Sequence, residues 1–273
     1  MSSRPLILLT NDDGIRSPGL LAAAEAVCDL GELLIAAPVT QQTGMGRSTP
    51  PIANRAVTRE RVTVACREIT AYSLTASPAQ AVSYAVLVLA PRRPDLVISG
   101  INYGENPGTC VTASGTVGAA LQAAEFGIPA LAVSLETDKR YHYHHGHDVD
   151  WRVAGRVTRE IAQAVLATQL PFDVDVLKID VPADATAETP WRITRQSRQP
   201  YYRLFRPEGV EADPQSGWVH LDYGVSIDWE RLEPDSDIAA FARDRVISVT
   251  PLSHDMTSRV DFHVLEQLLR GNT

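Results

Sequence analysis

Apolar runs long enough to form buried strands alternate with helix-forming segments from residue 5 to residue 180, and this alternation is the feature that most limits the fold. The first run, residues 6–9, does not alternate with polar residues, so both faces of that strand should be covered. Helix starts are indicated by Ser17-Pro18 and Ser77-Pro78, where a capping residue precedes a proline. Strands and helices in this order predict an α/β fold with a mostly parallel sheet and right-handed crossovers. The predicted strands are residues 6–9, 33–37, 94–100, 130–135 and 174–179, and the predicted helices are residues 17–30, 78–90, 114–126 and 150–168.

The alternation stops near residue 182, where proline, tryptophan, tyrosine and arginine become frequent. The segment GWVHLDYG, residues 217–224, has the pattern of a hairpin strand rather than of a crossover unit. Residues 259–270 carry apolar side chains at helical spacing. We therefore expect an α/β core over residues 1–181, followed by a β-rich arm and a C-terminal segment over residues 182–273.

The composition is that of an ordinary globular protein. Hydrophobic residues make up 44% of the 273 residues, which supplies a sizeable core, and the formal net charge is −8. This negative charge argues against binding to a nucleic-acid polymer or an anionic membrane surface. The apolar stretch over residues 81–90 is too short to span a bilayer, and the N-terminus shows no signal-peptide pattern. The three cysteines, Cys28, Cys66 and Cys110, lack metal-binding spacing and suit a reducing compartment, so we expect a cytoplasmic protein.

Oxygen-bearing side chains follow three of the predicted strands. Asp12 and Asp13 follow the first strand. Thr43 lies in the loop after the second strand, and Asn102 follows the strand that ends at residue 100. The ends of parallel strands meet at one edge of a sheet, and carboxylate, amide and hydroxyl oxygens are ligands for hard cations such as Mg²⁺ or Mn²⁺. The alternative is that residues 11–14, Asn-Asp-Asp-Gly, form only a polar turn.

The segment TASGTVG, residues 112–118, begins one of the predicted helices. The hydroxyl groups of Ser114 and Thr116 gather there with free backbone N–H groups, at the helix end where the dipole favours an anion. Gly115 would let a phosphate approach the backbone closely. The alternative is plain N-capping by Ser114. Next to a cation site, the sequence favours a phosphate site.

Other chemistries find less support in the sequence. There is no G-x-x-x-x-G-K-[ST] loop, and neither Ser99 nor Ser114 lies in a G-x-S-x-G elbow. Residues 142–147 include four histidines, and we interpret them as a mobile surface loop that can bind a transition metal rather than as the active centre. Arg47 lies in the loop after the second strand, from which it could reach a phosphate.

These residues together resemble the SurE (survival protein E) family. The matching blocks are ILLTNDDGIRSPG at residues 7–19, IAAP with its loop at residues 35–46, PDLVISGINYGENPG at residues 94–108, SGTVGAALQAAEFGIPALAVSL at residues 114–135, and VISVTPLSHDMT at residues 246–257. The resemblance implies a doubly wound, Rossmann-like core and an arm used in oligomerisation, as a homodimer or homotetramer. It also implies one divalent cation per subunit, Mg²⁺ or Mn²⁺, and hydrolysis of 5′- or 3′-nucleoside monophosphates.

The resemblance assigns roles to individual residues. It implies that Asp12, Asp13 and Asn102 are metal ligands, and that Thr43 replaces a serine ligand of the family. From the chemistry of hydrolysis, we also expect Asp12 or Asp13 to accept a proton from the attacking water. The residues that the resemblance implies for the substrate phosphate are Gly44, Asn106, Ser114, Gly115 and Thr116.

Departures from the family pattern keep other functions open. Gln80 stands where the family has an aspartate, and Tyr103 stands where a small residue is common. Thr43 and Gln80 leave room for a nucleotide-binding sensor with little turnover. A calcium-dependent nucleoside hydrolase also opens with an aspartate-rich strand end, but its motif contains a proline and further aspartates that residues 11–14 lack.

Overall fold

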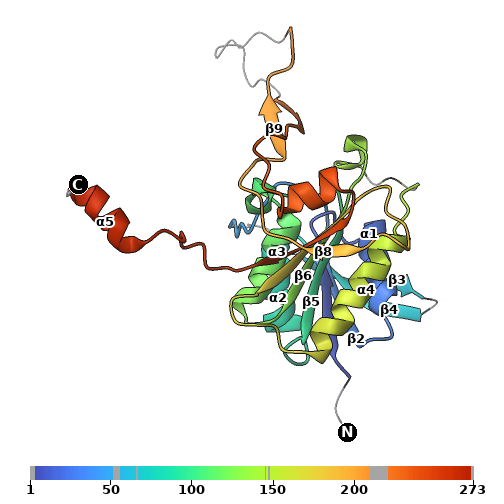
Figure 1. The fold of residues 1–273 in the computed structure, drawn as a ribbon. Coiled ribbons are helices and arrows are strands. Elements are labelled where there is room, and N and C mark those ends of the chain that lie inside the picture. Colours follow the sequence, from blue (N-terminus) through green and yellow to red (C-terminus); the bar gives the residue numbers. More distant parts are fainter. Residues whose placement is uncertain are drawn as a thin grey trace.

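The computed structural model describes residues 4–51, 56–65, 67–144, 146, 148–209 and 221–271. Within these residues, nine strands form one sheet with helices on both faces (Figure 1). In their order across the sheet, the strands are β3 (Val57–Val64), β4 (Arg67–Leu74), β2 (Glu32–Pro38), β1 (Leu6–Thr10), β5 (Leu96–Tyr103), β6 (Ala130–Leu135), β7 (Val176–Val181), β11 (Ile247–Leu252) and β8 (Trp191–Ile193).

The middle of this sheet is parallel, as the alternation of elements predicted. All neighbours from β4 to β7 pair in parallel. The strands toward the two edges differ, since β3 pairs antiparallel with β4, and β11 pairs antiparallel with β7 but parallel with β8. The predicted α/β class with a mostly parallel sheet is therefore confirmed.

Helices cover both faces of the sheet, which explains the unbroken apolar run at residues 6–9. Because successive side chains of a strand point to opposite faces, Ile7 and Leu9 of β1 pack in one core and Leu6 and Leu8 pack in the other. The first core is covered by α1 (Pro18–Val27) and α4 (Arg152–Ala167), and the second by α2 (Pro78–Tyr84) and α3 (Gly115–Glu125).

The predicted helix over residues 78–90 consists of two pieces. α2 ends at Tyr84, and the π-helix η1 (Ala85–Leu89) follows it. Ser77 and Gln80 form a capping box at the start of α2, and Gln80 Nε2 also donates to the backbone oxygen of Pro50 at 2.6 Å. The family departure at Gln80 therefore has a local structural role in this chain. The other short helices are η2 (Thr109–Thr112), η3 (Lys139–Tyr141) and η4 (Ala239–Arg243).

The chain beyond residue 181 builds both sheet and arm. β8 and β11 extend the main sheet, while β9 (Tyr202–Phe205) and β10 (Asp222–Val225) form a separate antiparallel pair that projects from it (Figure 1). The expected antiparallel strands near the C-terminus are thus present, and residues 217–220 of the predicted hairpin lie outside the described residues. The division into units at residue 181 stays a prediction.

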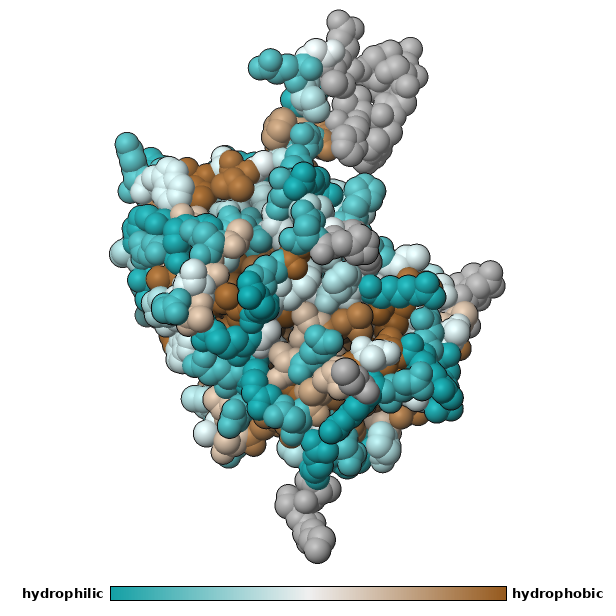
Figure 2. All heavy atoms as spheres, turned by 90° about the vertical axis from the view of Figure 1, so that its right-hand side faces the viewer, coloured by the Kyte–Doolittle hydropathy of each residue, from teal (hydrophilic) through white to brown (hydrophobic). Residues whose placement is uncertain are grey.

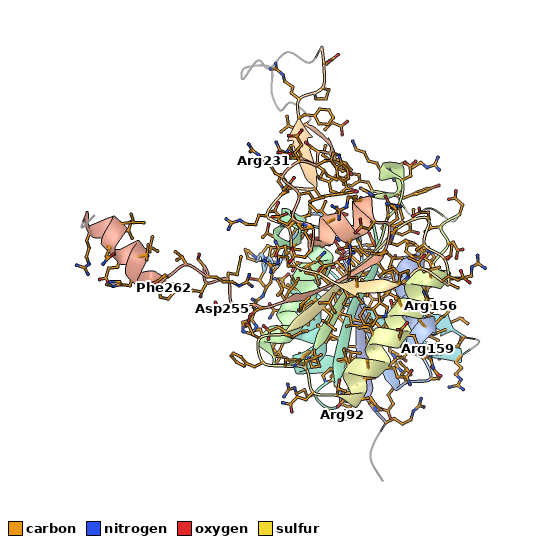
Figure 3. All side chains as sticks on the ribbon, viewed as in Figure 1. Arg92, Arg156, Arg159, Arg231, Asp255 and Phe262 are labelled. Atoms are coloured by element: carbon orange, nitrogen blue, oxygen red, sulfur yellow. The ribbon has the colours of Figure 1, made fainter. Side chains whose placement is uncertain are left out.

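The C-terminal segment leads away from the sheet. α5 (Phe262–Arg270) confirms the helix expected in residues 259–270, and Figure 3 shows Asp255 and Phe262 on the extension that carries it. No helix among the described residues combines the length and the apolar character needed to cross a membrane.

The outer side of α4 is charged and solvated. Arg156 and Arg159 lie on this helix (Figure 3), and Arg159 pairs with Asp29 beyond the end of α1. Such exposed ion pairs contribute little stability, typically about 0–1 kcal/mol. Figure 2 shows the neighbouring face of the molecule, where hydrophilic residues predominate and apolar residues appear in separate areas between them. The two apolar cores, rather than surface charges, hold the sheet and helices together.

Candidate functional site

The centre of the sheet is the place where strand order reverses. β1 pairs with β2 on one side and with β5 on the other. The chain first moves outward from β1 to β2 and later crosses back to β5, so the strand order reverses at β1. Ligand sites of open α/β sheets lie at such a reversal, beside the carboxyl ends of the strands. Asp12 and Asp13 follow β1, and Asn102 lies near the end of β5. The topology therefore brings the three side chains to the same edge, as the sequence predicted.

Asp12 and Asp13 form a buried acidic pair, with only 3% and 1% of their surfaces exposed. The hydroxyl of Thr116 donates to Asp12 Oδ1 at 2.5 Å. Asp13 accepts two bonds of 3.1 Å, from Gln41 Nε2 to Oδ1 and from the backbone N–H of Tyr103 to Oδ2. Burial raises the pKa of Asp12 to about 6. Burial and the charge of Asp12 raise the pKa of Asp13 well above its usual range.

The start of α3 lies directly against this pair. A Cβ atom added to Gly115 would lie 2.7 Å from both Cβ and Oδ2 of Asp12. A side chain at position 115 would therefore force the helix away from the strand end. Position 115 must be glycine because the Asp12 side chain lies so close to it. The sequence analysis gave a different reason, the close approach of a phosphate.

The loop after β2 carries Thr43 to the same edge. The backbone N–H of Gln42 donates to the backbone oxygen of Asp12 at 2.6 Å. Gln41 Nε2 also donates to the backbone oxygen of His142 at 2.8 Å, and the hydroxyl of Thr43 donates to that oxygen at 3.5 Å. Thr43 thus lies close to the acidic pair, with its side chain exposed. Sequence reasoning missed Gln41, because one glutamine in a polar loop has no distinguishing pattern.

The rest of this loop is fixed on α3. The backbone N–H of Gly46 donates to the backbone oxygen of Ala113 at 2.9 Å. Arg47 forms an ion pair with Glu125, and its Nε donates to Gln122 Oε1 at 3.0 Å. We expected the Arg47 guanidinium to be able to reach a phosphate, but it instead contacts the side chains of Gln122 and Glu125 on α3. Gly44 is exposed in the same loop with a left-handed backbone, φ +79°.

Asn102, near the end of β5, and Asn106, in the loop that follows β5, are both held by hydrogen bonds. Asn102 is buried, and its Nδ2 donates to the backbone oxygen of Gly104 at 2.5 Å. Asn106 Nδ2 donates to Ser134 Oγ at 2.9 Å, and the backbone N–H of Asn106 donates to Asp180 Oδ1 at 2.8 Å. Each predicted asparagine is thus fixed in one orientation.

Ser114 caps α3, which was the alternative to phosphate binding. Its hydroxyl oxygen accepts a bond of 3.2 Å from the backbone N–H of Val117. A serine hydroxyl that accepts one bond keeps its own proton for donation, so capping and phosphate binding are compatible. The hydroxyl proton of Thr116 is directed to Asp12, which ties the helix start to the acidic pair. The phosphate roles of Gly44, Asn106, Ser114, Gly115 and Thr116 stay predictions.

The prediction that the histidines of residues 142–147 lie in a surface loop is wrong for His142. His142 is buried, and its Nδ1 lies 2.9 Å from the hydroxyl of Tyr223 in β10. Its ring packs against Gly104, where an added Cβ would lie 2.6 Å from Nε2. His145 and His147 lie outside the described residues. His142 therefore connects the arm to the loops that surround the acidic pair.

The donor set at the acidic pair fits a hard cation. Within the described ranges, no three His, Cys, Asp or Glu side chains cluster so as to hold a metal. A cation at this edge would rely on the carboxylates of Asp12 and Asp13, on amide and hydroxyl oxygens from Asn102 and Thr43, and on water. Mg²⁺ is commonly held by one or two carboxylates while keeping several waters. The buried pair also gains from a cation, which offsets the mutual repulsion of the two charges.

Glu105, beside the site, should make stability depend on pH. Burial raises the pKa of Glu105 to about 7, although the hydroxyl of Tyr202 donates to its Oε1 at 2.5 Å. Since the folded-state pKa is raised, this side chain stabilises the fold below its unfolded pKa, and that stability is lost as the pH rises from about 4.3 to about 7. Between pH 5 and pH 8 the unmodified protein should lose on the order of 2–3 kcal/mol of its free energy of unfolding through Glu105, and Glu105→Gln should remove this loss. Urea unfolding at pH 5 and pH 8 would show it, with exposed Glu25→Gln as the control; parallel pH dependence of Glu105→Gln and the unmodified protein would contradict it.

Comparisons with known proteins agree with this architecture. The model of the family described as "Survival protein SurE" matches residues 7–203. A Thermococcus gammatolerans protein named 5′-nucleotidase SurE is 40% identical over 98% of this chain and 97% of its own. A Methanosarcina barkeri protein of the same name is 37% identical over 97% and 98%. The crystal structure of the SurE protein from Aquifex aeolicus superposes with a TM-score of 0.75 and 29% identity, covering 97% of this chain and 100% of that one. The chain belongs to the SurE family.

Proposed function

We propose that this protein is a 5′-nucleotidase that hydrolyses nucleoside monophosphates to nucleoside and phosphate with the help of one divalent cation, Mg²⁺ or Mn²⁺. The name of the curated relatives supports the activity. The observation that carries the proposal in this chain is the burial of two adjacent carboxylates against the start of α3. Hydrolysis of 3′-nucleoside monophosphates, a cytoplasmic location and assembly as a homodimer or homotetramer remain predictions from the sequence.

In this proposal, Asp12, Asp13, Asn102 and Thr43 hold the cation. A bound Mg²⁺ or Mn²⁺ supplies a positive charge that polarises phosphoryl oxygens and acidifies water at the site. The second half of the site binds the phosphate anion through Asn106, the Ser114 hydroxyl and the positive end of the α3 dipole.

The chemistry requires one proton acceptor. Water attacks phosphorus, a new P–O bond forms, and the bond to the nucleoside oxygen breaks as that oxygen takes up a proton from solvent. Asp12 or Asp13 accepts the proton of the attacking water, because both carboxylates lie at this edge and Asp12 contacts the start of α3. The donors at the helix start stabilise the negative charge that develops on the phosphoryl oxygens.

Phosphate release from a panel of 5′- and 3′-nucleoside monophosphates tests the proposal. Tag-free protein treated with EDTA should be inactive, and Mg²⁺ or Mn²⁺ should restore release, because the acidic pair needs the cation to bind an anionic substrate. Undiminished release after EDTA treatment would contradict the role of the metal. Bound nucleotide without turnover would indicate a sensor, and release of free base instead of phosphate would indicate a nucleoside hydrolase.

A further inference from the structure

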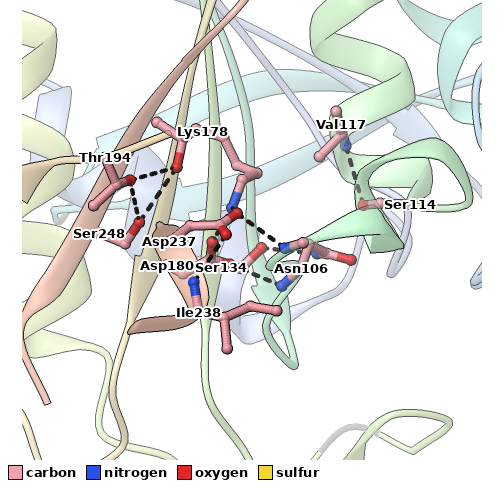
Figure 4. A network of polar contacts seen from close by, with 12 residues as sticks. Asn106, Ser114, Val117, Ser134, Lys178, Asp180, Thr194, Asp237, Ile238 and Ser248 are labelled. Carbon is pink, nitrogen blue, oxygen red and sulfur yellow. Dashed lines mark hydrogen bonds and ion pairs between the residues drawn. The ribbon is translucent and has the colours of Figure 1, made fainter. Parts of the chain in front are cut away.

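A buried ion network lies next to residues 104–108, which we call the phosphate loop because it carries Asn106, a predicted phosphate ligand. Lys178 and Asp180 come from β7, and Asp237 comes from the segment before η4; all three side chains are fully buried. Lys178 Nζ forms an ion pair with Asp180 Oδ2 and lies 3.1 Å from Asp237 Oδ2 (Figure 4). Buried lysines and aspartates are rare because each charge loses its hydration. Three of them in one place call for an explanation.

The two carboxylates of this network hold the backbone of the phosphate loop. Asp180 Oδ1 accepts a bond of 2.8 Å from the N–H of Asn106, and Asp237 Oδ2 accepts a bond of 2.9 Å from the N–H of Gly108. Asp237 Oδ1 accepts two further bonds, from the N–H groups of Ser197 and Ile238, at 2.9 and 2.8 Å. The network therefore connects the loop to the sheet and to the chain that follows β8.

Lys178 balances the charge of these acceptors. Burial alone would lower the pKa of Lys178, but the two carboxylates raise it, so the side chain is charged. One lysine and two aspartates leave one excess negative charge, which the backbone N–H donors to Asp180 and Asp237 offset. The aspartates can remain acceptors in the interior because Lys178 lies between them.

The side chain of Asn106 is fixed from a second strand. Its Nδ2 donates to Ser134 Oγ, and Ser134 of β6 lies in register between Asn102 of β5 and Asp180 of β7. Ser248 of β11 continues the same row beyond Asp180. A polar row thus crosses the sheet from the predicted metal ligand Asn102, and its middle members hold Asn106 by backbone and side chain.

We propose that Asp180 and Ser134 are positioning residues, which orient Asn106 for phosphate binding, and that Lys178 and Asp237 keep this arrangement charge-balanced and anchored at Gly108. The inference rests on the proposed function, since it assigns a purpose to the fixed orientation of Asn106. It extends that function to residues that do not touch the substrate.

Asp180→Ala tests the inference, because it removes the acceptor of the Asn106 N–H while Lys178 stays paired with Asp237. The KM for a nucleoside monophosphate and the inhibition constant of inorganic phosphate should both rise about tenfold, with a smaller change in kcat, because the misplaced group binds phosphate. Asp180→Asn keeps an acceptor oxygen and should restore most of the affinity. Ser134→Ala leaves the buried charges intact, so it tests the same orientation even if Asp180→Ala does not fold, and it should also raise KM.

Ser248→Ala is the matched control for buried polar loss. Its hydroxyl bonds with Thr194 and Thr250 at the far end of the row (Figure 4), so this variant should lose stability without a change in KM.

Amide hydrogen exchange over residues 104–110 gives a readout that does not need activity, and it should accelerate in Asp180→Ala while β1 remains protected. Unchanged KM and unchanged exchange in Asp180→Ala and Ser134→Ala, in an active enzyme, would overturn the inference. If the unmodified protein has no phosphatase activity but the phosphate loop still exchanges faster in Asp180→Ala, the proposed function is overturned. In that case Asp180 still positions the loop, but not for phosphate binding.

Discussion

Asp13→Asn is expected to lower kcat by about three orders of magnitude, because the variant loses one of two carboxylates that hold the cation and several kcal/mol of transition-state stabilisation with it. The amide is close in size to the carboxylate, and its oxygen can still accept a bond from Gln41 or from the Tyr103 N–H. The fold should therefore persist. Steady-state phosphate release at saturating Mg²⁺ measures the effect, and exposed Glu25→Gln should keep full activity.

The same substitution should stabilise the metal-free protein. The pKa of Asp13 is raised by burial and by the charge of Asp12, so its carboxyl costs stability once the pH exceeds its unfolded pKa. An asparagine carries no such charge, and the free energy of unfolding in EDTA at pH 8 should rise by about 1 kcal/mol or more. At pH 4 the gain should vanish. Near-normal turnover would show that Asp13 is not part of the catalytic site. A metal-free variant that is less stable than the unmodified protein at pH 8 would show that the buried charge of Asp13 does not destabilise the fold.

Lys178→Met should produce the largest loss of stability among the substitutions considered. It leaves Asp180 and Asp237 buried without their cation, and breaking a buried ion pair in this way costs about 3–5 kcal/mol. Urea unfolding at pH 7.5 measures the loss. The variant should be least destabilised at acidic pH, where Asp180, whose pKa is raised by burial, can take up a proton.

A charge-balanced double variant separates electrostatics from packing. Lys178→Met with Asp180→Asn leaves one buried negative charge, as in the unmodified protein, and keeps an acceptor for the Asn106 N–H. It should recover most of the stability that Lys178→Met loses, because the interior then holds no additional uncompensated charge. A double variant as unstable as Lys178→Met would mean that the lysine acts by filling space.

Five strands and four helices through residue 181 could be predicted from the sequence because each carries local signals, whereas β3 and β4 were not predicted as two strands. The apolar run at residues 6–9 and the Ser-Pro pairs at residues 17 and 77 mark the observed starts of β1, α1 and α2 to within one residue. The pairing of β11 between β7 and β8 could not be predicted in this way. β11 pairs antiparallel with residues about 70 positions earlier in β7 and parallel with residues 56 positions earlier in β8, and no local pattern encodes such partners.

The candidate site divides along the same line. Asp12, Asp13 and Asn102 could be placed at one edge of the sheet because Asp12 and Asp13 follow β1 and Asn102 lies near the end of β5, and strand ends converge by topology. Lys178 and Asp180 alternate with apolar residues in the sequence VLKIDV, which is the pattern of a half-exposed strand, yet β11 and the chain before η4 bury them. Arg47 was misjudged because its partners, Gln122 and Glu125, lie on a helix about 75 residues later. Sequence patterns therefore identify candidate ligand residues better than they identify the residues that hold those ligands in place.

The reach of Asp237 to Gly108 also bears on how modular this protein is. The bond spans 129 positions of sequence, from the last third of the chain to the loop beside the candidate site. The loop of residues 104–108 is therefore held only in part by contacts from the first 181 residues, since one of its anchors comes from the C-terminal third. A hybrid joined at residue 181 keeps that anchor only where the incoming segment again supplies a carboxylate at the position of Asp237.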